Sequence, residues 1–476
     1  MKIMRAPFAA SWLAISLVVS SSACSSSKSP NTTGADASAG GDAASNGQDA
    51  AAPDAGKPTY TCTSTVGTGS GMFTIDATNA NSGDVICIAA GTYSYAEIAN
   101  LTNVTIVPSG PVAFSGSIDI NANNNVTIDG TALAGITYGF TFAGYNGFAI
   151  ETNKTNNTDL TIKGVYLNGT SGIDGNNQGN ITYDGTEATL LFSRLVMDTI
   201  KITGGGAIFA GTYQDISTYN NVTIGLTIRN VVVINDVNDG TIRVNGSSIF
   251  QFLFENWNVT GETELVNADQ GILNVSGGYG TVRDFYRDGG WGYIGRIVIG
   301  NLNSPADFYG YNIIDIDGQN YGTFDLRVAM NTTTAGQMPI YGGNAHLYNI
   351  TTGNKPTTNT FISPIAVLYG FIDASGQTYT MEMKNCFSFD NQKDASAGAE
   401  MLTYVNFGTA MVDASNNLEV DGAIGSLPPN YLVDQTSCVP AAGSPLIGAG
   451  TPIALTATDI YGKSRGSSYD IGAAQH

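Results

Sequence analysis

A short repeat constrains this chain more than any other feature of its sequence. The tetrapeptide Asn-Val-Thr-Ile at 103–106 recurs 22 residues later at 125–128. Within each copy apolar and polar residues alternate, which is the period-two pattern of a β-strand. A repeat of about 20–25 residues built from short strands and Gly/Asn turns is typical of a solenoid. We therefore predict an all-β fold, a single-stranded right-handed parallel β-helix, the hand favoured by parallel crossovers.

The pattern continues irregularly to about residue 440, and the composition agrees with it. Only 12% of the 476 residues are charged, and 59 are Gly. Such a chain is too apolar to be disordered throughout, and its Gly, Asn and Thr suit short strands joined by tight turns. Asn recurs where the coils are expected to turn, because it tolerates left-handed backbone and can stack in ladders.

The charge balance excludes several partners. The formal charge is -20. Lys2 and Arg5 lie in a segment that we expect to be removed, which leaves 17 basic (19 minus 2) against 39 acidic residues, or -22. A surface of this sign repels nucleic acid and anionic membranes. It also repels acidic polysaccharides, unless a local basic patch or a bound cation reverses the field.

The N-terminus reads as an export signal over residues 1–23. Lys2 and Arg5 give a positive start, an apolar run follows at 12–19, and small residues precede Cys24. The run is too short to span a bilayer stably. Ser21-Ser22-Ala23-Cys24 resembles a bacterial lipoprotein box, which implies acylation of Cys24. The alternative is ordinary secretory cleavage, with Cys24 incidental.

Residues 24–58 are predicted to be a flexible linker behind the lipid. Residues 25–58 contain no Val, Ile, Leu, Met, Phe, Tyr or Trp. Such a coil reaches about 30 Å root-mean-square. We expect a monomer on the cell outer membrane or cell surface that touches the membrane only through the lipid anchor. A secreted protein is the alternative, and the β-helix is placed at 59–440 with a closing segment at 441–476.

Four cysteines remain after Cys24, and an exported protein can form disulfides. Four cysteines allow three pairings. The pairs nearest in sequence are Cys62 with Cys87 and Cys386 with Cys438, and they would join the two ends of the solenoid. The alternative is four free buried thiols.

Residues 73–93 resemble the opening segment of the pectate-lyase-like β-helix superfamily. That segment runs G-D-x-I-x-(I/V)-x-x-G-x-Y after a short helical turn. Here the matching residues are Gly83-Asp84, Ile86, Ile88, Gly91 and Tyr93. The resemblance implies a helical cap over the N-terminal end of the bore, where an exposed coil edge would invite pairing with another chain.

The tail resembles the closing segment of bacterial surface β-helix proteins of the choice-of-anchor type. Their ends run G-S-P-x-I-x-x-G, then D-x-x-G-x-x-R, then D-I-G-A. This chain has Gly443-Ser444-Pro445, Asp459, Arg465 and Asp470-Ile471-Gly472-Ala473. We expect a structural role, in which Arg465 pairs with Asp459 or Asp470 and fixes a loop over the last coil.

The densest polar and aromatic stretch is Glu262–Arg296, and it supplies the candidate site. A flat sugar face packs well on aromatic rings, and arginine forks bind carboxylate bidentately. The predicted substrate-binding residues are Arg283, Trp291, Tyr293 and Arg296. An anionic sugar is therefore expected to dock here.

Glu262 and Glu264 are two residues apart, so on a strand they share one face and suit Ca²⁺. This arrangement resembles the alginate and chondroitin lyases of the same superfamily, which place E-x-E on one strand as calcium ligands. Those lyases follow it with a Lys base and an R-x-G arginine, here Arg287-Asp288-Gly289. The Lys is missing, and Asp269 stands near its place.

Two reactions fit these residues. In β-elimination, Ca²⁺ and arginines such as Arg287 neutralise a uronate carboxylate, and Tyr286 or Asp269 removes the C5 proton. In hydrolysis, Asp269 works with Asp284 or Asp288. A glycoside hydrolase is the less favoured enzyme.

The competing class is a non-catalytic protein that binds glycan or serves as an adhesin-like structural surface protein, because this solenoid hosts both classes. The missing Lys and the scarcity of His favour it. His346 is the only histidine before the terminus. It lies in a strand-like segment, where an outward ladder histidine is expected rather than a ligand.

Overall fold

The structure is a computed structural model of the whole chain, in which residues 58–476 are described apart from a set of internal segments. Those segments are 144–147, 152–156, 170, 175–180, 184–185, 205–208, 211–220, 235–241, 244–246, 261–265, 268–278, 290–293, 300–306, 318–322, 329–343, 356–365, 371–378, 391–401, 406–409 and 421–424. The predicted signal segment, Cys24 and the linker up to residue 57 also lie outside the described residues.

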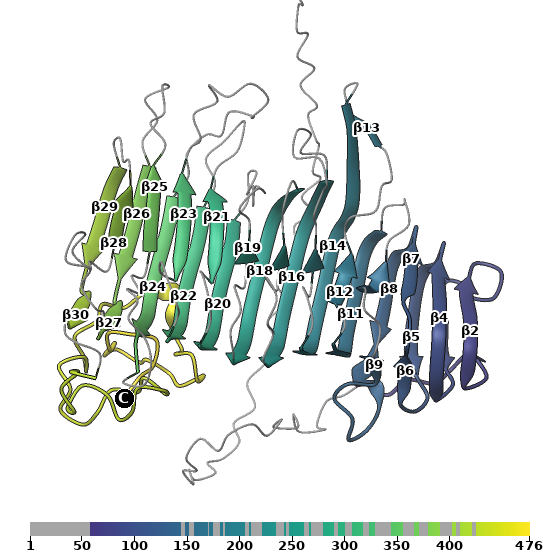
Figure 1. The fold of residues 1–476 in the computed structure, drawn as a ribbon, viewed down its shortest axis with the longest axis horizontal. Coiled ribbons are helices and arrows are strands. Elements are labelled where there is room, and N and C mark those ends of the chain that lie inside the picture. Colours follow the sequence, from purple (N-terminus) through teal and green to yellow (C-terminus); the bar gives the residue numbers. More distant parts are fainter. Residues whose placement is uncertain are drawn as a thin grey trace, which may run out of the picture.

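The described chain is a stack of β-strands that follow one another along a single long axis (Figure 1). The first fifteen strands are β1 (Ser64–Val66), β2 (Ser70–Asp76), β3 (Val85–Ile88), β4 (Gly91–Ala99), β5 (Thr102–Pro108), β6 (Val112–Phe114), β7 (Ile118–Asn121), β8 (Asn124–Asp129), β9 (Phe140–Ala143), β10 (Phe148–Glu151), β11 (Asn157–Asn168), β12 (Ser171–Asp174), β13 (Ile181–Tyr183), β14 (Thr186–Thr203) and β15 (Phe209–Ala210). The others are β16 (Asn221–Ile234), β17 (Ile242–Arg243), β18 (Ser247–Thr260), β19 (Val266–Asn267), β20 (Tyr279–Asp288), β21 (Gly295–Ile299), β22 (Asp307–Ile316), β23 (Phe324–Val328), β24 (Asn344–Gly353), β25 (Ala366–Gly370), β26 (Tyr379–Lys384), β27 (Phe387–Phe389), β28 (Leu402–Val405), β29 (Ala410–Ser415) and β30 (Leu418–Val420).

Strands of successive coils pair in parallel, as a parallel β-helix requires. The exception among the named strands is the antiparallel pair of β13 with β14. One sheet contains 26 strands, and β21, β23, β25 and β28 form a second. Two three-residue 3₁₀ helices, η1 (Gly130–Ala132) and η2 (Ala454–Thr456), are the helices of the described residues. Neither is long and apolar enough to cross a membrane.

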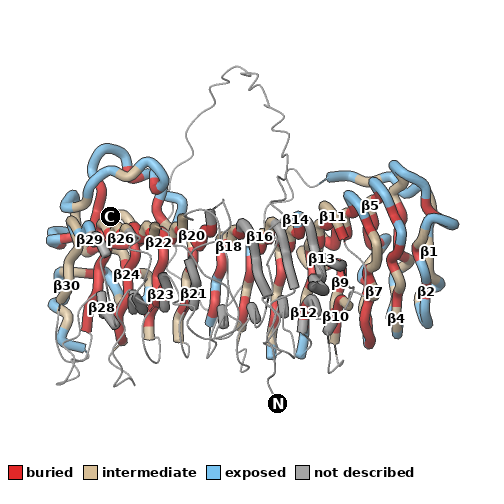
Figure 2. Tube along the Cα trace, turned by 90° about the horizontal axis from the view of Figure 1, so that it is seen from above, coloured by how far each residue is buried: buried red, intermediate tan, exposed pale blue. Residues whose placement is uncertain are grey.

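The pairing register confirms the 22-residue repeat. Strand β5 pairs with β8 so that Val104 lies beside Val126 and Ile106 beside Ile128. All four of these side chains are buried, because alternate residues of each strand face the bore. Figure 2 shows the buried positions recurring from coil to coil along the axis. Aromatic rings stack in the same way, as Trp257 does on Phe285 with centroids 5.3 Å apart.

The expected asparagine ladders are present at the coil corners. Asn230 and Asn256 both have positive φ, 55° each, and the Asn256 side-chain amide donates to the Asn230 Oδ1 at 2.7 Å. Asn125 bonds Asn103 at 2.8 Å in the same manner. Asn tolerates this left-handed backbone better than most residues, and its side chain then bonds the coil before it.

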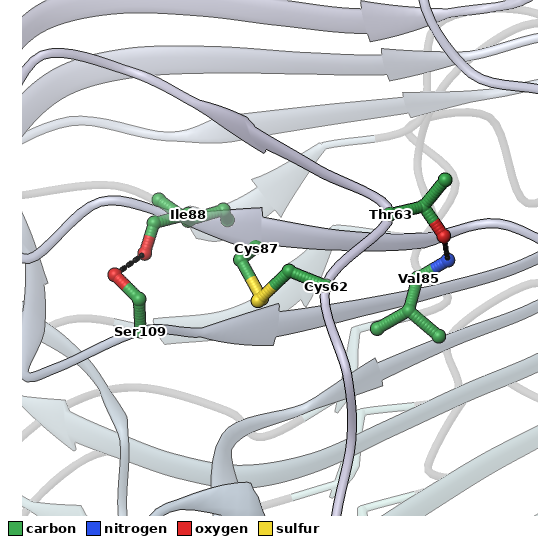
Figure 3. The surroundings of a disulfide bond; sticks show 6 residues. All are labelled: Cys62, Thr63, Val85, Cys87, Ile88 and Ser109. Atoms are coloured by element: carbon green, nitrogen blue, oxygen red, sulfur yellow. Dashed lines mark hydrogen bonds between the residues drawn. A yellow bond between two sulfur atoms is a disulfide. The ribbon is translucent and has the colours of Figure 1, made fainter.

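The N-terminal end is joined by a disulfide between Cys62 and Cys87, which confirms that predicted pair (Figure 3). Strand β1 runs parallel to β3 there, and the Val85 backbone N–H donates to the Thr63 hydroxyl at 3.1 Å. The expected helical cap is wrong. The chain from Asp76 to Ala80 makes one isolated turn, closed by the Ala80 N–H to the Asp76 carbonyl at 3.0 Å, and β1 and β2 open the solenoid instead.

The C-terminal segment, which we call the tail (residues 425–476), crosses the outer side of the last coils (Figure 1). Its apolar residues Leu446 and Ile471 form a second core with outward side chains of β22 and β27, including Ile314 and Phe387. This core exists because the strands of these coils carry apolar residues on both faces. The tail therefore closes the fold, as its resemblance implied.

Arg465 is a structural residue of the tail, but the predicted ion pair with Asp459 or Asp470 is not what holds it. Its guanidinium is almost fully buried and donates to the backbone carbonyls of Gly472 at 3.2 Å and Ala473 at 2.6 Å. Asp459 instead accepts from backbone N–H groups such as that of Lys463 at 2.7 Å. Desolvation lowers the pKa of Arg465, against the field of the nearby carboxylates.

The predicted pair of Cys386 with Cys438 is wrong. Both thiols are free and buried. Cys386 faces the core inside the solenoid, whereas Cys438 belongs to the second core beneath the tail. The wall of the solenoid separates the two sulfur atoms, although they lie near one another in sequence compared with the length of the chain.

Candidate functional site

Several of the predicted site residues lie outside the described part of the chain. They are the proposed calcium ligands Glu262 and Glu264, the base Asp269, and the ring residues Trp291 and Tyr293. Arg296 lies on β21, where its backbone pairs with that of Asp325 on β23. These residues stay predictions.

Arg287 does not face a substrate. Its side chain is fully buried inside the solenoid, where Nε and Nη2 donate to the two carboxylate oxygens of Asp315 at 2.6 and 2.8 Å. The Thr323 hydroxyl donates to the same carboxylate at 2.8 Å. A buried arginine in a bidentate pair cannot reach a polysaccharide outside, so the catalytic role predicted for Arg287 is wrong.

Tyr286 faces the opposite way from Arg287 and lies beneath the tail. Its ring packs against the second core, and its hydroxyl lies 3.4 Å from the Asp288 carboxylate. Burial is the main cause of the raised pKa of Tyr286, and the charge of Asp288 adds to it. Because its ring packs beneath the tail and not against an open groove, the assignment of Tyr286 as the base is also wrong.

Arg283 alone among the predicted arginines presents a described side chain to the outer surface. It lies on β20 in ion pairs with Glu255 of the preceding coil and, at 3.4 Å, with Asp284. Its guanidinium also lies 6.0 Å from the ring centre of Tyr311 on the next coil. Arg283 thus marks one end of a polar and aromatic surface that continues toward the C-terminus.

We call this surface the outer Tyr–His face. It consists of two adjacent rows of side chains, each row taking one residue from each successive coil. The register pairs Tyr309 of β22 with His346 of β24 and Glu382 of β26. Two residues further along the same strands it pairs Tyr311, Tyr348 and Lys384. The face therefore comprises Arg283, Tyr309, Tyr311, His346, Tyr348, Glu382 and Lys384, of which Tyr311 and Tyr348 are buried and the other five partly exposed.

Glu382 is the hub of this face. One carboxylate oxygen accepts from the Tyr348 hydroxyl and lies 3.1 Å from His346 Nδ1, and the other accepts from Lys384 Nζ. Partial burial by itself would raise the pKa of Glu382. The hydrogen bonds from Lys384, Tyr348 and His346 outweigh it and lower the pKa to about 2. Glu382 is therefore a fixed negative charge that orients its three neighbours.

The rings of the face are packed against one another. Tyr309 stacks on His346 with ring centres 4.7 Å apart and planes within 12°. Tyr348 lies close to the same imidazole, with its hydroxyl 3.2 Å from Nδ1. Burial, followed by the hydrogen bond to Glu382, raises the pKa of Tyr348, and burial likewise raises that of Tyr309. These tyrosines are hydrogen-bonding and stacking groups of the face.

His346 is the one group of the face suited to proton transfer. Nδ1 lies 3.1 Å from a carboxylate oxygen of Glu382, and in the tautomer with the proton on Nδ1 the unprotonated ring nitrogen is Nε2. The His346 side chain is 20% exposed, so this ring borders solvent. The face therefore combines a candidate base with aromatic surface and two cations, Arg283 and Lys384.

Both cations of the face are already paired. Arg283 contacts Glu255, and Lys384 contacts Glu382 and, at 3.2 Å, Asp413 of the next coil. Hydrogen bonding to Glu382 is the main cause of the raised pKa of Lys384. No group of three or more His, Cys, Asp or Glu side chains is placed to hold a metal ion in the described part of the chain. The predicted calcium ligands lie outside it.

Sequence reasoning foresaw an outward ladder histidine at 346, and the structure confirms it. The sequence analysis did not predict that His346 contacts Glu382. The two residues are 36 positions apart, and the coils between β20 and β26 differ in length. The available signal was the alternation itself. In H-L-Y and M-E-M-K polar residues alternate with apolar ones and so fall on one side of each strand.

Comparison with known proteins carries no argument about this chain. No family model matches the chain, and no curated protein does either. A solved structure of an alginate lyase, AlyF-OU02 in complex with G6, is similar over 70% of this chain and 91% of that one, with 10% sequence identity and a TM-score of 0.29. The chain is thus defined by its own pairing pattern as a parallel β-helix, and a likeness of this size carries no argument about activity.

Proposed function

We propose that this chain is an exported, surface-anchored β-helix protein that binds polysaccharide on its outer Tyr–His face. The observation that supports this most is the stacking of Tyr309 of β22 on His346 of β24 in the outer row, where both rings are partly exposed and Tyr348 of the second row lies beside the imidazole. Sugars pack on aromatic rings by their apolar faces and bond polar groups by their hydroxyls. The lipid anchor at Cys24, the linker and the location at the cell surface are parts of the same proposal.

The finer proposal is a lyase for an anionic glycan. Arg283 or Lys384 would bind the uronate carboxylate and so acidify the C5 proton. His346 Nε2 would remove that proton, the electron pair would form the C4–C5 double bond, and the C4–O bond to the leaving sugar would break. The leaving oxygen would take its proton from water, and Glu382 would keep the imidazole in place. A cation such as Ca²⁺ would offset the protein's net charge.

The alternative is a glycan-binding or adhesin-like surface protein without catalysis. One observation favours it: Arg283 and Lys384 already contact carboxylates of their own chain. A substrate carboxylate would have to compete with Glu255 and Glu382 for them, which weakens the case for charge neutralisation in a transition state.

A panel of alginate, pectate and glycosaminoglycans, with and without Ca²⁺, tests both proposals. A lyase produces unsaturated ends that absorb in the ultraviolet, and His346→Gln should lower that rate by at least about 100-fold. Tyr309→Ala should weaken glycan binding in either case. The matched control is Arg194→Gln, which removes an exposed ion pair with Asp159 on a distant coil.

The outcomes separate the two classes. Binding without ultraviolet absorbance establishes the non-catalytic alternative and removes the lyase. Absorbance that survives His346→Gln places catalysis elsewhere on the chain. Wild-type protein that binds no glycan of the panel contradicts the proposed function itself.

A further inference from the structure

The tail runs along one border of the outer Tyr–His face. The border is the corner ladder formed by Asn312, Asn349, Asn385 and Asn416, all with positive φ. Tyr311, Tyr348 and Lys384 each come directly before one of these corner residues. Whatever covers the corner ladder therefore stands immediately beside this row of the face.

The tail segment Thr451–Asp459 is anchored to this ladder at both of its ends. At one end Asn385 donates to the Thr451 carbonyl at 2.8 Å and accepts from the Thr451 backbone N–H at 2.8 Å. At the other end Asn312 donates to the Thr458 carbonyl at 3.0 Å. Asn385 and Asn312 lie two coils apart, so the segment between them passes the coil that carries Tyr348.

The middle of that segment presents an apolar side chain to solvent. It is the turn η2, and Leu455 on it is 51% exposed. The segment is braced from behind as well, because the Tyr469 hydroxyl donates to the Ile453 carbonyl at 3.2 Å. Leu455 is thus an exposed apolar side chain on a backbone that is fixed at both ends and in the middle.

We infer that the tail segment Thr451–Asp459 forms a wall of the glycan-binding site and that Leu455 contacts the bound sugar. This inference rests on the proposed function of the outer Tyr–His face. The glycan lies across the coils, along the axis of the solenoid, with the partly exposed rings of Tyr309 and His346 beneath it and the tail at its side. The tail then has a second role besides closing the fold, because the site is incomplete without it.

Glycan affinity of point variants tests the wall. Leu455→Ala should weaken binding of the glycan found in the panel above by roughly five-fold, because about half of a leucine side chain becomes buried on binding. Leu455→Met keeps the apolar surface and should bind as the wild type does. Tyr461→Ala is the matched control, since Tyr461 is an equally exposed tail residue, 53%, whose hydroxyl bonds the Ser437 carbonyl. Unchanged thermal unfolding of each variant checks that its fold is intact.

The results separate this inference from the proposed function. If Tyr309→Ala weakens binding but Leu455→Ala does not, the face binds glycan and the tail is no part of the site. Equal losses for Leu455→Ala and Tyr461→Ala also overturn the wall, because the effect is then not confined to the border. If Leu455→Ala weakens binding while Tyr309→Ala does not, the glycan lies elsewhere and both proposals fail.

Discussion

Glu382 shows how one carboxylate can organise a surface. It accepts hydrogen bonds from a tyrosine, a lysine and a histidine that come from its own strand and the adjacent one. The same negative charge orients all three donor side chains. A neutral group at this position would not form three charge-assisted hydrogen bonds. The cost is that Glu382 must stay ionised for the face to keep its geometry.

The stability of the protein should therefore depend on pH through Glu382. Its folded pKa of about 2 lies below the ordinary value of 4.5. A depressed carboxyl pKa contributes stability that is present above about pH 4.5 and is lost as the pH falls toward 2. The difference in unfolding free energy between wild type and Glu382→Gln should shrink over that range in urea titrations. If the unfolding free energies of the two proteins changed with pH in parallel, the stabilising role of ionised Glu382 would be contradicted.

The interior position of Arg287 could be predicted from the alternation of its strand, but its buried partner could not. The alternation in F-Y-R-D places Arg287 on the same side of the strand as Phe285, and Phe285 is buried. The pattern thus contained the interior position. The catalytic role was inferred instead from the resemblance of Arg287-Asp288-Gly289 to the R-x-G of the lyases, and a charged residue can lie inside when a partner such as Asp315 is buried with it.

At the scale of the element, the corners decide where each strand turns. Asn256 takes φ of 55° and hydrogen-bonds the coil before it, so backbone shape and coil stacking depend on one residue. The sequence predicted these corners well, since few side chains tolerate the left-handed region. It could not predict the coil lengths, because loops of very different size leave from the same solenoid without disturbing its pairing.

Substitution of a corner residue separates its two contributions. Asn256→Ala should lose about 1–3 kcal/mol of unfolding free energy, from left-handed strain and the lost hydrogen bond together. Asn256→Gly should lose about 1 kcal/mol or less, because glycine accepts the positive φ. Urea denaturation measures both, and Asn168→Ala, whose residue lies in a strand without positive φ, is the control. Equal losses for Ala and Gly would show that backbone strain plays no part.

At the scale of the whole molecule, the tail protects an apolar outer wall. Ile314, Ile316, Phe387 and Phe389 are fully buried although they point away from the bore. Removal of residues 441–476 should expose them and produce strong binding of a hydrophobic dye together with aggregation. Dye fluorescence and size-exclusion chromatography measure this, with a chain lacking residues 1–57 as the control. A monodisperse truncated protein without added fluorescence would contradict the capping role.

The parallel pairing of strands from coil to coil also determines how this molecule would respond to a pulling force. Each coil bonds its two neighbours, so cohesion passes from turn to turn rather than through a common centre. A tether at the N-terminus would load the first turns, where a covalent sulfur bridge joins Cys62 to Cys87. The opposite end has no such bridge among its described residues, where Cys386 and Cys438 are free thiols. Under tension the unravelling should therefore start at the C-terminal end and advance toward the disulfide-joined first turns.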